Sequence, residues 1–164
     1  GLDLLENLGM DCIHDRVRCL TGWLLQELAA LRHPNGAPVV RIYGPGTTEC
    51  RGGTVTLNFY DANGHCIDHP VIERRAGEHR ISLRTGCFCN PGAGELALGL
   101  SKGELFHCMR EVGENVAHIT YEDFRRCIDD KSTGAVRISF GWASTFADAE
   151  AFLAFARGMR EERA

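Results

Sequence analysis

The sequence predicts an α+β fold of two layers, in which a small, mainly antiparallel sheet is covered by helices. Two observations support this prediction. Four short segments have the apolar patterns of strands, and five or six segments with helical patterns are interleaved with them. The 164 residues also contain no repeat and no linker that would divide them, and they are enough for one domain with its own core. We therefore expect a single domain over residues 1–164.

The first half is predicted to contain the longest helix and three strands. Between residues 11 and 33 apolar side chains recur every three or four positions, which indicates an amphipathic helix. Asp68, followed by Pro70, is a typical helix start, and Gly9 is a typical helix stop. The expected elements are helices at 2–8, 11–33 and 68–78, and strands at 39–43, 54–59 and 81–84.

The second half is predicted to be mostly helical. Ser101, Thr120 and Thr145 each precede an acidic residue by three positions, the pattern of a capping box at a helix start. Asn90 and Pro91 suit the first positions of a further short helix. One strand is expected at 135–140, where apolar residues alternate with others.

Composition argues against several classes of partner. The formal net charge is −4, which gives no reason to expect binding to nucleic acid or to an anionic membrane. No apolar run approaches the roughly 20 residues that span a bilayer, and no signal peptide is visible. We expect a cytoplasmic protein. Since the sequence begins without methionine, we also expect it to be part of a longer protein.

The sequence holds eight cysteines. Without a secretory signal, reduced thiols are expected rather than disulfides. Cys87 and Cys89 form one close pair, whereas a structural zinc site normally needs a second pair of ligands. No two histidines are four residues apart on a predicted helix, so no metal ligand is predicted. Cys12 and Cys19 lie seven residues apart on one predicted helix, which is the spacing of core positions.

The run from Arg84 to Ala93, Arg-Thr-Gly-Cys-Phe-Cys-Asn-Pro-Gly-Ala, is the strongest candidate for chemistry. It places Cys89 at the start of a predicted helix and near Arg84, and both positive influences favour a thiolate. Gly86 and Gly92 allow the backbone to turn and move. Cys89 is therefore a candidate nucleophile, although a turn with two small, half-buried cysteines fits the same residues.

Arg137 is the second candidate. In the predicted strand it points away from the apolar face, where a guanidinium can bind a carboxylate through two hydrogen bonds. The residue pattern alone favours a solvated arginine on the outer face of an edge strand.

The cysteine run resembles the active-cysteine segment of the molybdenum cofactor sulfurases, a branch of the class V aminotransferase fold related to the cysteine desulfurases. Its shorter form, Arg-Thr-Gly-x-x-Cys, also resembles the nucleophile loop of selenocysteine lyases and desulfurases. The resemblance extends to residues 16–24, 53–59 and 134–148. It covers most of the chain, and the cysteine motif is its most specific part.

The resemblance implies a role for three residues. Cys89 matches the cysteine that accepts sulfur as a persulfide, Arg137 matches the arginine that holds the carboxylate of the substrate, and Arg84 matches the motif arginine at the mouth of the site. One departure is Gly94, where the sulfurases usually have a further cysteine.

A second departure concerns the cofactor. The family binds pyridoxal phosphate through a lysine of a large domain that precedes the small one, and neither Lys102 nor Lys131 lies in such a motif. The chain therefore resembles the C-terminal small domain alone, without a cofactor of its own and without turnover in isolation. For the full-length protein the resemblance implies L-cysteine as sulfur donor, an acceptor that could be molybdenum cofactor, and a homodimer.

Two alternatives stay open from the sequence. The first is a class V lyase, epimerase or aminotransferase domain in which Cys89 is incidental. The second is a non-enzymatic module that binds zinc or a partner through Cys87 and Cys89.

Overall fold

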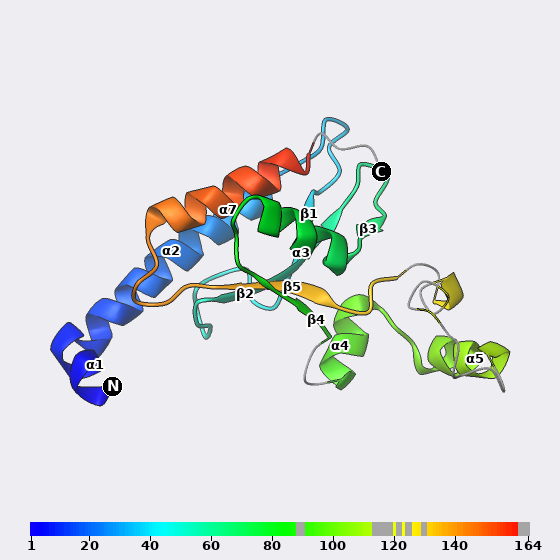
Figure 1. Cartoon of the computed structure of the whole chain (residues 1–164), viewed down its shortest axis with the longest axis horizontal. Helices are drawn as coiled ribbons and strands as arrows, with labels where there is room; N and C mark the ends of the chain where they lie inside the picture. Colours follow the sequence, from blue (N-terminus) through cyan, green and yellow to red (C-terminus); the bar gives the residue numbers. More distant parts are fainter. Residues whose placement is uncertain (88–90, 113–119, 121–122, 124–125, 129–130, 161–164) are drawn as a thin grey trace.

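The computed structural model describes residues 1–87, 91–112, 120, 123, 126–128 and 131–160. One open sheet lies at its centre (Figure 1), with its longest path of strands in the order β1-β2-β5-β4 and with β3 paired to β2. All described strand pairs are antiparallel. The strands are β1 (Val40–Tyr43), β2 (Thr54–Tyr60), β3 (Cys66–Ile67), β4 (Arg84–Gly86) and β5 (Ala135–Ser139).

Helices flank this sheet unequally. The long helices α2 and α7 run side by side over one face together with α3, whereas α4 lies toward the other side of the sheet near β4, and α5 lies farther out (Figure 1). The described helices are α1 (Leu2–Leu8), α2 (Met10–Ala30), α3 (His69–Glu78), α4 (Pro91–Leu98), α5 (Lys102–Val112) and α7 (Phe146–Gly158). The predicted α+β class with a small antiparallel sheet is confirmed.

The hydrophobic core fills the layer between the sheet and the helices α2, α3 and α7. Alternation along β2 sends Val55, Leu57 and Phe59 to this layer, where all three are fully buried. The rings of Phe152 and Phe155 from α7 lie 6.4 and 5.9 Å from the ring of Phe59. Because one face of the sheet carries the core, the alternate residues of every strand are left for the opposite face.

Local capping signals in the sequence proved reliable. The Asp68 side chain accepts a hydrogen bond at the start of α3, and the Ser101 and Thr145 boxes form as predicted at α5 and α7. The Thr120 hydroxyl likewise accepts from the Asp123 backbone, but most of the helix expected there lies outside the described residues.

The third strand was predicted three residues too early. Arg80 adopts a left-handed conformation (φ 58°), and the Ile81 backbone N–H closes the end of α3 on the Ala76 carbonyl. Ile81 and Leu83 then pack against the core without strand pairing. Pairing with β5 begins only at Arg84, so the strand covers Arg84–Gly86 instead of 81–84. The two-residue strand β3 was not predicted.

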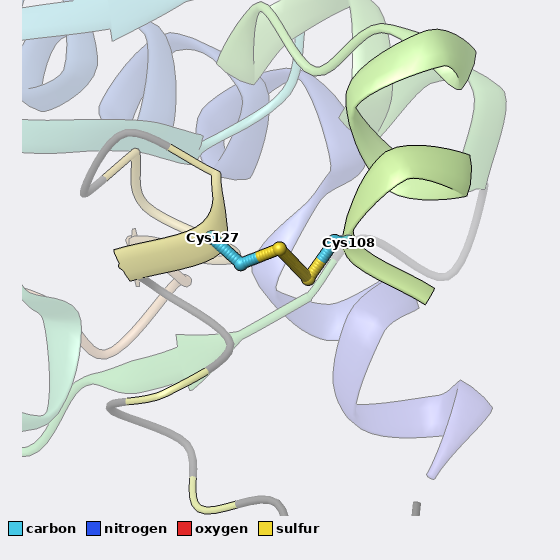
Figure 2. The surroundings of a disulfide bond; sticks show 2 residues. All are labelled: Cys108 and Cys127. Atoms are coloured by element: carbon cyan, nitrogen blue, oxygen red, sulfur yellow. A yellow bond between two sulfur atoms is a disulfide. The ribbon is translucent and has the colours of Figure 1, made fainter. Parts of the chain in front are cut away.

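The cysteines depart from expectation at two places. Cys108 of α5 and Cys127 form a disulfide (Figure 2), so the expectation of reduced thiols is wrong for this pair. Cys12 and Cys19 are exposed rather than buried in the core. The buried residues of α2 begin only at Leu20, because the N-terminal part of the helix extends beyond the sheet (Figure 1).

Two further findings concern the described part of the chain. None of its helices is both long and apolar enough to cross a bilayer. None of its His, Cys, Asp or Glu side chains gather in threes in a way that could hold a metal ion.

Candidate active site

A row of four polar side chains crosses the face of the sheet opposite the core. Tyr43 of β1 pairs with Thr56 of β2, Thr56 pairs with Arg137 of β5, and Arg137 pairs with Arg84 of β4. Residues in register share one face of a sheet, so the strand pairing alone brings these four together. The row unites the two arginines that the sequence predicts for substrate binding.

The position of Arg137 differs from the one that its pattern favoured. β5 lies between β2 and β4, so Arg137 stands on an inner strand and not at an edge. Its side chain is exposed while its neighbours Val136 and Ile138 are buried. The guanidinium is therefore held at a defined point of the sheet and faces outward.

Arg84 and Arg137 are direct cross-strand partners, and both are exposed. Like charges directly opposite each other destabilise a strand pair. Among the described residues, neither guanidinium has an ion pair with a carboxylate. Two adjacent guanidiniums that pair with no carboxylate in the described part of the chain form a site that is suited to an anionic group of a ligand.

A cleft of about 560 Å³ opens over this pair. We call it the arginine cleft. Its volume is within the ordinary range of small-molecule sites, roughly 300–1,000 Å³. It is lined by Thr54, Thr56, Arg84, Thr85, Gly86, Cys87, Ala135 and Arg137.

Cys87 is exposed, has a free thiol and lines the arginine cleft. It is therefore more accessible than the half-buried turn cysteine that fitted the sequence. Gly86, the last residue of β4, has a φ of 120°, which interrupts the extended backbone and with it the alternation of side chains. Cys89, the predicted nucleophile, lies outside the described residues, two positions further along the chain.

Close backbone contact fixes one wall of the cleft. A Cβ atom added to Gly134 would lie 2.6 Å from the carbonyl carbon of Gly86 and 2.6 Å from the His69 Nε2 atom. Only glycine permits this approach, which brings the chain before β5 against the end of β4. The spacing between the Arg137 strand and the cysteine segment therefore depends on Gly134.

A buried amide supports the sheet beside the row. Asn58 is 1% exposed, and its Nδ2 atom donates to the carbonyl of Gly134 (3.1 Å) and to the hydroxyl of Tyr43 (3.3 Å). Burial, reinforced by the nearby Tyr60 hydroxyl, raises the pKa of Tyr43, so its phenol stays neutral. The row thus carries positive charge at its arginine end only.

Sequence reasoning missed Tyr43, Thr56 and Asn58. Alternation along 54–60 does place Thr56 and Asn58 opposite the buried Val55 and Leu57. The missing information was the register between strands, which the sequence does not encode locally.

The lysines do not fit a pyridoxal phosphate site. The ammonium of Lys131 donates to the Gly99 carbonyl (3.0 Å) and pairs with Glu104, so it ties the start of α5 to the end of α4. Lys102 is exposed at the first position of α5. Neither residue lines the arginine cleft.

No family model matches this sequence. The chain is similar, however, to proteins described as molybdenum cofactor sulfurase over 94% of its length. Identity is 39% over 160 residues for the protein of Bos taurus, 38% over 163 residues for that of Homo sapiens and 40% over 159 residues for that of Arabidopsis thaliana. The resemblance stated from the cysteine motif is thereby confirmed. The chain spans less than a fifth of these relatives, between 17% and 19% of their length.

The fold is also similar to a solved structure, the cysteine desulfurase CsdA (S-sulfonic acid) from Escherichia coli. The TM-score is 0.56 at 14% identity, and the match covers 98% of this chain and 28% of that one. At this level of identity the likeness concerns the fold.

Proposed function

We propose, from the similarity to molybdenum cofactor sulfurases, that this chain is the C-terminal small domain of a cysteine desulfurase-like sulfur transferase. In this proposal Cys89 accepts the sulfur, Arg137 binds the carboxylate of the substrate, and Arg84 lies at the mouth of the site. L-cysteine is the sulfur donor. By analogy with these relatives we propose molybdenum cofactor as the sulfur acceptor and a homodimer for the full-length protein.

The observation that carries the proposal is the arginine cleft. Arg137 and Arg84 face it as direct strand partners, and Cys87 lies on its lining. Cys89 follows Cys87 by two positions in the sequence. We propose that a carboxylate bound at the arginines and the thiol of Cys89 serve one substrate the size of a cysteine.

The proposed reaction moves one sulfur atom. The thiolate of Cys89 forms a bond to the sulfur of L-cysteine, and the bond between that sulfur and the β-carbon breaks. The electron pair of the broken bond stays on the carbon, which takes up the proton that the Cys89 thiol lost on becoming a thiolate and so becomes the methyl group of alanine. The products are a Cys89 persulfide and alanine, so each of the two sulfur atoms is oxidised by one unit and the β-carbon is reduced by two.

Pyridoxal phosphate is the cofactor that we propose for the full-length protein, where it would supply the electron sink for breaking the carbon–sulfur bond. Since Lys102 and Lys131 do not fit its site, the cofactor lysine belongs to another part of the protein. The contribution of this chain is then to bind the carboxylate, to present the thiol and to raise its thiolate fraction beside positive groups.

The role of Arg137 is tested with two substrates in the full-length enzyme. Arg137→Ala removes a charge-assisted contact worth about 1.5–3 kcal/mol, so kcat/KM for L-cysteine should fall by roughly 10- to 100-fold. Cysteamine lacks the carboxylate, so its turnover should change little. Arg74→Ala, which removes an exposed arginine on α3, is the matched control. Equal losses for both substrates would argue against carboxylate binding by Arg137.

A further inference from the structure

A second cavity lies away from the arginine cleft, between the N-terminal part of α2 and the segment that leads into β2. Its volume is about 210 Å³. Ile13, Val17 and Thr21 line it from one side of α2, and Thr48 and Arg51 line it from the segment. We call it the α2 cavity.

Tight contacts bracket the α2 cavity at both ends. A Cβ atom added to Gly22 would lie 3.0 Å from the Thr48 methyl carbon, and one added to Gly53 would lie 2.7 Å from a methyl carbon of Val17. The segment therefore packs against the helix at two points. Between these two contacts the segment is separated from helix α2, and this gap is the α2 cavity.

Two buried polar atoms on the lining of this cavity have no hydrogen-bond partner among the described residues. They are the Thr21 hydroxyl and the Arg51 Nε atom. Thr21 is 1% exposed. A buried polar group without a partner costs free energy, so these two atoms are suited to hydrogen bonding with a bound polar group. The Nε–H needs an acceptor, and the hydroxyl can donate or accept.

The charges on the lining are positive. Arg51 is anchored by donating Nη1 to the Pro45 carbonyl and Nη2 to the Thr54 carbonyl (2.8 Å), which leaves Nε for the cavity. Arg18 also lines the cavity, and no described carboxylate is paired with either guanidinium. Burial lowers the pKa of Arg51, as expected for a partly buried cation that has no anion beside it among the described residues.

We propose that the α2 cavity binds a small organic anion, with its carboxylate or phosphate at Arg18, Arg51 and Thr21. Its carbon body packs against the side chains of Ile13 and Val17, which form the apolar part of the lining. The cavity is smaller than typical drug-sized pockets, which limits the ligand to a few carbon atoms. This site is separate from the arginine cleft, and its occupation does not depend on the proposed sulfur chemistry.

Isothermal titration calorimetry with butyl phosphate, butyrate, inorganic phosphate and butylamine tests the proposal. At least one of the two organic anions should bind saturably and more tightly than inorganic phosphate, and butylamine should not bind. The two organic probes distinguish a phosphate ligand from a carboxylate ligand. The proposal would be overturned if neither organic anion bound saturably, or if inorganic phosphate bound as tightly as the organic anions.

Two variants locate the binding. Arg18→Gln should weaken it at least fivefold, since Arg18 is exposed and its loss leaves the fold intact. Thr21→Val keeps the shape of the side chain but removes the unpartnered hydroxyl. It should weaken binding at least threefold while it maintains or raises the melting temperature without ligand. Arg74→Gln, on α3, should change neither value. Unchanged affinity in both cavity variants, or the same loss in Arg74→Gln, would contradict the assignment.

Discussion

Arg84 and Arg137 stand directly opposite each other on the edge strand β4 and the inner strand β5, on the sheet face that does not carry the core. A strand pair gains stability from opposite charges and loses it from like charges, so this arrangement works against folding. Its benefit is chemical, because two exposed guanidiniums side by side can bind one anionic group. The arginine pair therefore destabilises the sheet but provides the proposed binding site for a substrate carboxylate.

Removing one of the two charges should stabilise the chain. We expect Arg84→Gln to raise the free energy of unfolding by roughly 0.2–1 kcal/mol, the range of cross-strand pair energies. Urea denaturation measures this change, and the gain should shrink at high salt because salt screens the repulsion. Arg74→Gln is the control. Arg74 is an exposed residue of helix α3 and does not face another arginine across a strand pair, so its replacement should not raise the free energy of unfolding. A loss of stability in Arg84→Gln would mean that the pair does not repel.

Gly134→Ala should be strongly destabilising. The new Cβ would lie 2.6 Å from the backbone of Gly86, and a backbone atom cannot move aside as a flexible side chain can. Overpacking of this kind costs about 1–3 kcal/mol, which thermal unfolding would detect. Gly77→Ala is the control, since nothing lies within 4 Å of its added Cβ, and in helix α3 it should be neutral or stabilising. Equal effects of the two substitutions would contradict the tight contact.

The Lys131–Glu104 pair should make stability depend on pH in the acid range. Hydrogen bonding from Lys131, and then from Ser101, lowers the pKa of Glu104 from 4.5 to about 2. A carboxyl with a lowered pKa contributes stability that is complete above pH 4.5 and is lost as the pH falls toward 2. NMR titration of the Glu104 carboxyl carbon should show the pKa rising toward 4.5 in Lys131→Gln, with a shallower acid loss of stability. The lowered pKa of Asp148, which depends on Thr145, should stay unchanged in this variant.

The disulfide should be detectable as a link between two separate peptides. Cys108 and Cys127 are 19 residues apart, and a loop of this size corresponds to roughly 3 kcal/mol of entropic stabilisation. Replacing both cysteines by alanine should therefore lower the free energy of unfolding by up to about that amount. Cys12→Ala, which removes an exposed free thiol, should leave it unchanged. Peptide mapping without reductant that finds free thiols at both positions would contradict the pairing.

The sequence predicts the helices of this fold better than its strand edges, and the reason is locality. Asp68, Ser101 and Thr145 start helices through hydrogen bonds to backbone groups at most three residues away, so a short motif contains the necessary information. Strand bounds depend on pairing with distant segments. The shift from 81–84 to Arg84–Gly86 follows from which residues pair with β5, and no local pattern reveals that pairing.

The candidate site shows the same contrast between local motifs, which the sequence contains, and strand pairing, which it does not. Arg84 and Arg137 were proposed from motifs, and the structure brings them together in one cleft. Tyr43, Thr56 and Asn58 could not be added, because their place beside the arginines follows from register. The exposure of Cys87 could not be predicted either, because the positive φ of Gly86 ends the alternation of side chains just before it. The role of Cys89 stays a prediction.

Mass spectrometry of the full-length protein after treatment with L-cysteine tests the central claim most directly. The account predicts one added sulfur atom on the peptide that contains Cys87 and Cys89, located at Cys89 by fragmentation. Cys89→Ser should abolish this addition, and Cys87→Ser should only reduce it. Sulfur that still accumulates in Cys89→Ser, or that is found on Cys87 alone, would contradict the assignment of Cys89 as the sulfur acceptor.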